Sequence, residues 1–128
     1  MTATTINRVA ALHALAVHVD QHDLAGDLSG IRFDGVDWTG TVVQVHLPAT
    51  LAAWVRSLGD VEASGHRSGG NIHLWIVGTI GTFPLGLVLV LTPGRDLELV
   101  RQLSDQVADT SCQFPATIEL PEALGGTR

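Results

Sequence analysis

The organisation of this chain follows from residues 61–91, which read VEASGHRSGGNIHLWIVGTIGTFPLGLVLVL. Two pairs, Gly69-Gly70 and Gly81-Thr82, divide this stretch into three strand-like segments. Two-residue turns at both pairs would create a three-stranded antiparallel meander, because Gly-Gly suits a type I′ turn and Gly-Thr a type II′ turn. We predict that one face of the meander forms a wall of the core and carries Val61, Ala63, Gly65, Leu74, Ile76, Gly78, Phe83, Leu85, Leu87, Leu89 and Leu91.

The second face of the predicted meander is mixed in character. Its cross-strand neighbours in the same register are His66 with His73 and Val90, Ser64 with Trp75 and Val88, and Glu62 with Val77 and Gly86. Trp75, Val77, Val88 and Val90 would form an apolar patch. Either a helix covers this patch as a second core layer, or another protein covers it as an interface. The unbroken apolar run of residues 85–91 is typical of a strand that is buried on both faces.

Histidines on this face suggest a second kind of site. Side chains of His66 and His73 would lie about 5 Å apart at Cβ and could share a metal ion. His46, on a comparable face of an earlier strand, is the candidate third ligand, because zinc needs three or four. The alternative is a solvated pair of surface histidines. His18 and His22 have the i, i+4 spacing of a two-ligand helical site, for which a solvated helix end is the commoner explanation.

The remaining sequence predicts three helices and further strands. A helix over residues 4–23 has a broad apolar arc that includes His13 and excludes His18; its apolar members are Ile6, Val9, Ala10, Leu12, Leu15, Ala16, Val17 and Val19. The other expected elements are strands over 31–34 and 41–47, helices over 49–58 and 95–109, an edge strand over 114–120 and a loose tail over 122–128. This order predicts an α+β fold, a two-layer sandwich of a mainly antiparallel sheet with helices on one face.

Length and composition indicate one cytoplasmic domain over residues 1–128. A chain of this length buries a hydrophobic core without metal or disulfide staples. One cysteine excludes an intramolecular disulfide and agrees with a reducing cytoplasm. Residues 72–91 are long enough to span a bilayer, but their glycines and Pro84 suit a hairpin better, so we expect no membrane association. The net charge of −6 and the scattered arginines argue against nucleic-acid binding.

The residues show no convincing catalytic set. Glu62, Ser64 and His66 are spaced two apart on one predicted strand, which holds their side chains about 6.5 to 7 Å apart and prevents direct contact. The chain has no Gly-x-Ser-x-Gly motif. Ser68-Gly69-Gly70 lies in a hairpin turn and has no following helix that would bind a phosphate. We therefore expect a protein that is not an enzyme and needs no cofactor.

Three segments carry a family resemblance. They are LAAWVRSLG at residues 51–59 followed by Val61, IHLWIVGT at residues 72–79, and FPL at residues 83–85. Together they resemble small uncharacterised α+β accessory proteins of actinobacteria and their phages, which pair a Trp-containing short helix with a hairpin. The likeness covers about a third of the chain. Seven arginines without a single lysine also fit the GC-rich coding of such genomes. The resemblance implies an accessory role and carries over no catalytic residue.

These observations predict a non-enzymatic protein-interaction module that forms a homodimer and serves as an accessory protein of an actinobacterium or actinophage. Its interface would comprise Trp75, Val77, Val88 and Val90, or the first helix, and a host or phage protein would be a further partner. The alternative is a histidine-based metal or small-ligand binder that uses His66, His73 and His46. An acidic inhibitor that mimics nucleic acid is a third class, which the absence of an acidic block disfavours.

Overall fold

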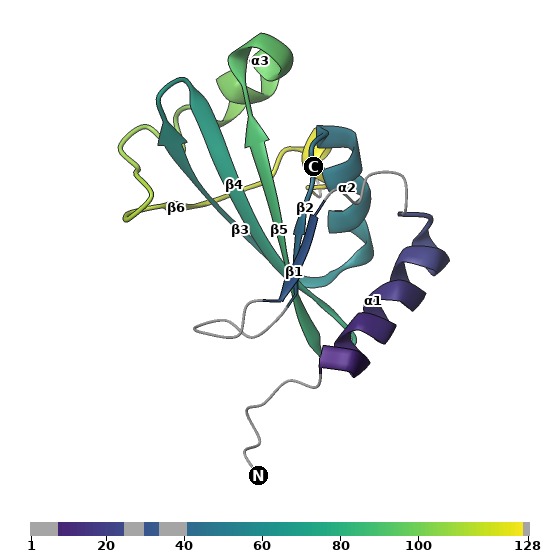
Figure 1. The fold of residues 1–128 in the computed structure, drawn as a ribbon. Coiled ribbons are helices and arrows are strands. Elements are labelled where there is room, and N and C mark those ends of the chain that lie inside the picture. Colours follow the sequence, from purple (N-terminus) through teal and green to yellow (C-terminus); the bar gives the residue numbers. More distant parts are fainter. Residues whose placement is uncertain (1–7, 25–29, 34–40, 127–128) are drawn as a thin grey trace.

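A computed structural model describes residues 8–24, 30–33 and 41–126. Its elements in chain order are α1 (Arg8–His22), β1 (Gly30–Phe33), β2 (Thr41–Gln44), α2 (Pro48–Ser57), β3 (Gly59–Ser68), β4 (Asn71–Ile80), β5 (Phe83–Leu91), α3 (Pro93–Leu103), β6 (Ala116–Ile118) and the 3-10 helix η2 (Glu122–Leu124). Figure 1 shows their arrangement. The predicted α+β class is confirmed. The first four residues of the predicted helix 4–23 and the end of the predicted strand 31–34 lie outside the described residues.

One six-stranded sheet connects the strands in the order β1-β2-β5-β4-β3-β6. Strands β2 and β5 pair in parallel, and the other pairs are antiparallel. The parallel pair requires a long crossover, which α2, β3 and β4 provide. This crossover places the two early strands beside the last strand of the meander and makes β5 a central strand of the sheet.

The register of the meander is as predicted. His66 lies opposite His73, Ser64 lies opposite Trp75, and Trp75 in turn lies opposite Val88. Both turns fall on the predicted glycine pairs. One detail differs: φ is positive at Gly69 (+61°) and not at Gly70, so this turn does not have the two positive φ angles of type I′. In both turns only the first residue, Gly69 or Gly81, has a positive φ.

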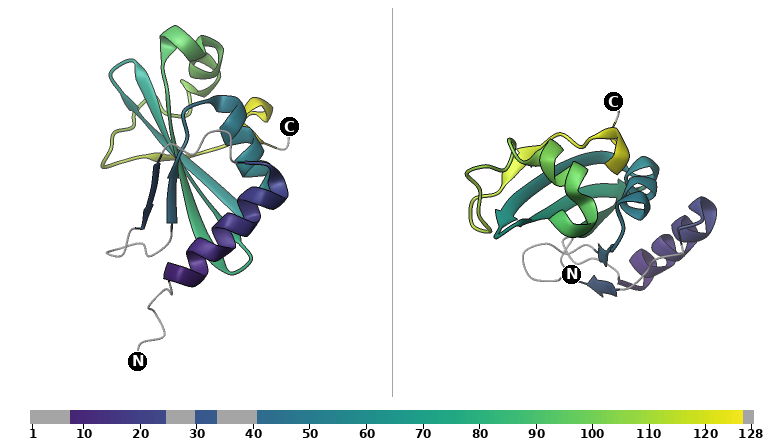
Figure 2. Two further views of the ribbon diagram at one scale, coloured as in Figure 1. Left: turned by 45° about the vertical axis from the view of Figure 1, so that its right-hand side comes forward. Right: turned by 90° about the horizontal axis from the view of Figure 1, so that it is seen from above.

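The hydrophobic core lies on one face of the sheet. The buried strand residues on this face are Val43, Val45, Ala63, Ile72, Leu74, Ile76, Leu85, Leu87, Leu89, Leu91 and Ile118. Helices cover them with Leu15, Val19, Leu51, Trp54, Val55, Leu103 and Leu124. Both views in Figure 2 show α1 and α2 on the same side of the sheet. The described helices therefore contribute to a single core layer, as the predicted two-layer sandwich requires.

Helix α1 packs through a different face from the one that its apolar pattern predicts. Leu15 (3% exposed) and His18 (6%) are buried, whereas Val9 (78%) and Leu12 (47%) are exposed. The prediction that His18 lies outside the buried face is therefore wrong, as is the burial expected of Val9, Leu12, Val17 and His13. The reason is that α1 lies at the edge of the molecule, where it contacts α2. At this position only a narrow stripe of the helix surface is covered by the rest of the protein. A nearly all-round apolar pattern does not specify which stripe that is.

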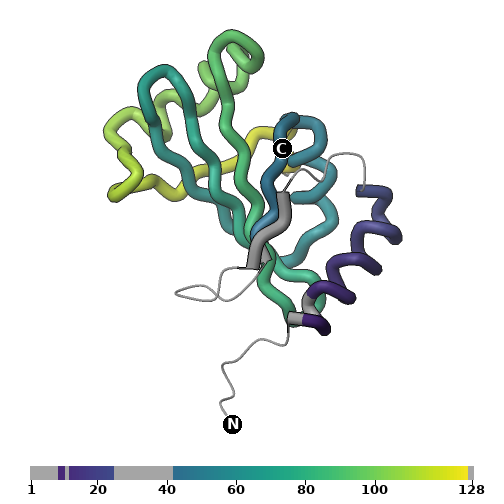
Figure 3. Tube along the Cα trace, viewed as in Figure 1, coloured from purple at the N-terminus to yellow at the C-terminus, as the bar shows by residue number. Residues whose placement is uncertain are grey.

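The C-terminal segment forms a shorter strand than predicted, and its last residues are better packed than predicted. Strand β6 pairs only with the edge of β3, from Ala116 to Ile118, because the flanking prolines have no backbone N–H to donate. The chain then crosses to α2, as Figure 3 shows. The predicted loose tail is wrong for residues 122–126, since η2 buries Leu124 completely against the core. Residues 127–128 lie outside the described part of the chain.

The described residues contain no helix that is long and apolar enough to cross a membrane. Residues 72–91, whose length suits a membrane span, instead form most of β4, the second turn and β5. Leu85, Leu87 and Leu89 in this stretch point into the core below the helices. Its apolar character therefore reflects a central strand of the sheet.

Candidate interaction surface on the open sheet face

The face of the sheet opposite the helices holds the candidate site, and no described helix covers it. We call it the open face. Its described residues include Val42, Gln44, Glu62, Ser64, His66, His73, Trp75, Val77, Thr79, Pro84, Gly86, Val88, Val90 and Thr117, which alternate along their strands with the core residues. The backbone N–H of Val45 donates to Val88 O (2.9 Å), so the chain continues beside β5 beyond β2. Alternation then places the exposed His46 on the open face as well.

An apolar centre occupies the middle of the open face. Trp75, Val77, Val88 and Val90, the four residues predicted as an interface, are each half-buried and lie on the adjacent strands β4 and β5. Val42 lies on the same face of β2, opposite Gly86, but it is only 3% exposed and so adds little to the accessible apolar surface. The structure thus brings the four predicted residues together. The position of Val42 beside them was not predicted, because the pairing of β2 with β5 was not predicted.

The indole of Trp75 lies against the sheet instead of standing away from it. A Cβ atom added at Gly86 would come within 2.6 Å of Trp75 Cη2 and 3.0 Å of Trp75 Cζ2. Gly86 therefore leaves the space that the ring occupies, on the strand next to that of Trp75. The ring keeps one side on the sheet, which explains its half-buried state in a face that no described helix covers. The result is a flat apolar surface.

Polar side chains surround this apolar centre. His66 and His73 stack on one side with ring centroids 4.9 Å apart and ring planes inclined by 17°. Gln44, Glu62 and Thr117 are exposed at the other margins. Glu62 is the only carboxylate among the open-face residues named above. An apolar centre with a polar and nearly uncharged rim is the anatomy of protein interfaces.

The histidines form a pair and not a three-ligand site. Among the residues that the structure describes, no three His, Cys, Asp or Glu side chains are close enough to hold a metal ion together. His46 follows β2, and β5 separates β2 from the strand of His73, a distance of about 10 Å at the usual strand spacing. Stacked rings also direct their in-plane lone pairs side by side, whereas two nitrogens must converge to about 2 Å from a shared zinc ion. The His66–His73 pair fits a stacked rim contact.

Sequence reasoning missed a buried histidine that joins α1 to α2. His18 Nε2 lies 2.8 Å from Ser57 Oγ, and Ser57 Oγ donates to Trp54 O at 2.7 Å. Because the hydroxyl has one proton and donates it to Trp54 O, His18 Nε2 must carry a proton and act as the donor. Burial lowers the pKa of His18, and neighbouring His22 lowers it further. His18 is thus neutral near pH 7 and serves as a structural link.

The spacing of His18 and His22 does indicate their proximity, and their ring centroids lie 4.4 Å apart. The contact with Ser57 has no sequence signal, since the two residues are 39 positions apart. Ser57 is not an activated nucleophile in this arrangement, because its proton is directed to a carbonyl of its own helix. No protein-family model, curated protein or solved structure matches this chain.

Proposed function

We propose that this protein is a non-enzymatic interaction module that forms a homodimer through the open face. The observation that supports this function is the apolar centre of Trp75, Val77, Val88 and Val90 on a sheet face that no described helix covers. Burial of apolar surface contributes about 25 cal/mol per Å². A partner that covers the centre therefore gains free energy, and contiguous apolar patches of this kind mark interaction sites.

A second copy of the chain fits this face in area. The six strands contain 4, 4, 10, 10, 9 and 3 residues, 40 in all. Each residue covers about 3.3 Å along its strand and about 4.8 Å between strands. The face thus offers about 630 Å², within the range of about 600 to 1,000 Å² that each partner contributes to an interface of standard size. Two such sheets would pack face to face at about 10 Å, with their apolar centres in contact.

A second copy also fits this face in charge. The chain has a net charge of −6, so two copies repel each other wherever their acidic side chains come close. The described side chains of the open face include one carboxylate, that of Glu62, at the margin. Association through this face therefore brings few like charges together, which favours self-association here over other surfaces.

The family resemblance supports an accessory role in an actinobacterium or actinophage, where a host or phage protein would be a further partner. Residues 51–59 form most of α2 and residues 72–79 lie within β4, so the resemblance concerns segments of the core and the open face. A cytoplasmic location agrees with the single cysteine. The proposed activity needs no cofactor, since association alone accounts for it.

The oligomeric state of the Trp75→Asp variant tests this proposal. A buried charge on the apolar centre should convert the dimer into a monomer, as measured by light scattering after size exclusion. Phe114→Asp is the matched control, because Phe114 is 72% exposed and belongs to the turn before β6, outside the apolar centre. Circular dichroism verifies that both variants fold. The dimer should persist in a chelator, because it requires no metal.

Two results would contradict the proposal. A monomeric natural protein at all accessible concentrations would exclude the homodimer. A Trp75→Asp variant that folds and stays dimeric would place the interface elsewhere, for example on the exposed apolar residues of α1.

A further inference from the structure

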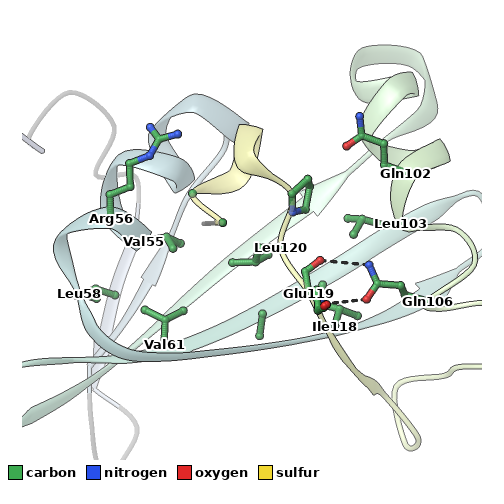
Figure 4. Close-up of a pocket in the computed structure, with 14 residues that line it drawn as sticks. Val55, Arg56, Leu58, Val61, Gln102, Leu103, Gln106, Ile118, Glu119 and Leu120 are labelled. Atoms are coloured by element: carbon green, nitrogen blue, oxygen red, sulfur yellow. Dashed lines mark hydrogen bonds between the residues drawn. The ribbon is translucent and has the colours of Figure 1, made fainter. Parts of the chain in front are cut away.

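A groove of about 1090 Å³ opens on the helix-covered side of the sheet, between α2 and α3. Figure 4 shows its lining residues. The groove exists because β6 pairs with β3 only opposite residues 63–65, after which the chain turns away toward α2. The first part of β3 consequently has no strand beside it on this edge. Apolar side chains of β3 and of the departing segment line the floor: Val61, Ala63, Ile118 and Leu120.

Hydrogen bonds brace both sides of the groove. On one side, Arg56 Nη2 donates to Glu122 O (3.0 Å) and ties α2 to η2. On the other side, the Gln106 side chain bonds the backbone of Glu119 twice, since Nε2 donates to Glu119 O (3.2 Å) and Oε1 accepts from Glu119 N (2.8 Å). The side-chain amide of Gln106 thus makes the two backbone hydrogen bonds that a neighbouring strand would make, at the point where β6 ends. The groove is therefore preformed, which reduces the cost of ordering when a ligand binds.

Charge is sparse and separated across the groove. Among the described lining residues, Arg56 is the only cation and Glu119 the only anion. They lie on opposite sides, Arg56 on α2 and Glu119 beside Gln106, as Figure 4 shows. The Arg56 guanidinium has five N–H donors, of which Nη2 provides the one that holds Glu122 O. An apolar floor with one available cation at its side is the pattern of sites that orient a largely apolar ligand by one polar end.

We propose that this groove binds an acyl chain that ends in a carboxylate. The hydrocarbon lies along the partly exposed Val61 and Leu120, above the nearly buried Ala63 and Ile118. The carboxylate pairs with Arg56, whose planar guanidinium matches a carboxylate in geometry. The opposite side, with Glu119, accommodates the uncharged end of the chain. The groove lies on the side of the sheet opposite the open face, so this proposal is independent of the homodimer.

Titration with decanoate tests the proposal, with 1-decanol as the uncharged analogue. Decanoate should bind the natural protein, and amide NMR signals should shift at the groove floor and at Arg56. Arg56→Gln should weaken decanoate binding about tenfold, because a charge-assisted hydrogen bond is lost. Decanol binding should weaken much less, by the loss of the bond from Arg56 to Glu122 O alone. Arg101→Gln is the matched control, since Arg101 is an exposed arginine of α3 outside the groove. Val61→Gln should weaken the binding of both ligands.

Three results would overturn the proposal. The first is the absence of decanoate binding to the natural protein. The second is a set of NMR shifts on the open face, around Trp75 and Val88, in place of the groove. The third is an equal loss of decanoate affinity in Arg56→Gln and Arg101→Gln, which would indicate a general attraction of anions. The melting temperature of each variant shows whether it remains folded.

Discussion

The two faces of β4 receive alternate residues of one strand, yet they have different environments. Ile72, Leu74 and Ile76 are at most 1% exposed, whereas Trp75 and Val77, which alternate with Leu74 and Ile76, are half-buried. The difference lies in the helices, since those described all pack on the first face. Side-chain alternation thus sorts residues into two sets, and the position of the helices turns one set into the core. The other set, although nearly as apolar at its centre, remains available for a partner.

The largest contrast between the faces should come from truncation of neighbouring residues on β5. Leu87→Ala removes a fully buried side chain and should lower the free energy of unfolding by about 2 to 5 kcal/mol. Val88→Ala, on the half-buried open face, should cost about 1 kcal/mol or less. Urea denaturation of dilute monomer measures both values. Equal losses would mean that the open face is a second core layer.

Substitution of two glycines tests how well each face of the sheet tolerates an added Cβ atom. A Cβ at Gly78 would lie 2.9 Å from Leu58 Cβ and 3.2 Å from Gly59 O, atoms that cannot move without the backbone. Gly78→Ala should therefore destabilise the fold by about 2 to 3 kcal/mol.

The corresponding change on the open face should cost less. The three atoms nearest to a Cβ at Gly86 all belong to the Trp75 indole on the half-buried face. We expect Gly86→Ala to displace this ring toward water, with a loss of about 1 kcal/mol and a red shift of tryptophan fluorescence. Unaltered fluorescence in a folded Gly86→Ala variant would contradict the position of the indole.

The smallest effect concerns the pH dependence of α1 docking. The pKa of His18 in the folded protein is lowered from its ordinary value of 6.5, so the unfolded chain binds more protons between the two pKa values. The stabilisation from neutral His18 is complete above about pH 6.5 and is lost as the pH falls through the lower, folded value. His18→Gln should cost about 1 kcal/mol at pH 8, from the lost bond to Ser57, and less at pH 5.

Urea denaturation at a series of pH values measures the effect of His18→Gln. The difference between natural protein and variant should shrink steadily as the pH is lowered. A constant difference across this range would show that protonation of His18 has no part in the stability of the fold.

The meander was predictable because its signals are local. Turn glycines at Gly69 and Gly81 set the strand lengths, and alternation along residues 71–80 set the facing pairs. The grouping of Trp75, Val77, Val88 and Val90 followed from the same register. The helices were also predicted in number and order, although α3 ends at Leu103 and not near residue 109.

Helix α1 shows where this reasoning fails. Its apolar residues surround most of the helix, so periodicity predicts burial for Val9 and Leu12 as readily as for Leu15. The stripe that is buried depends on where α2 lies, and Ser57 on α2 provides the hydroxyl that makes a buried His18 favourable. Neither fact can be obtained from residues 8–22 taken alone.

The amino-acid sequence alone specified the strands of the meander, their turns and the two sets of side chains, because these depend on neighbours in the chain. Contacts between distant segments selected the rest. They include the parallel pairing of β2 with β5, the covered face of the sheet, the burial of His18 and the groove that opens where β6 leaves β3. In each case several apolar surfaces of the chain could fill the one core, and local sequence patterns do not determine which of them does so.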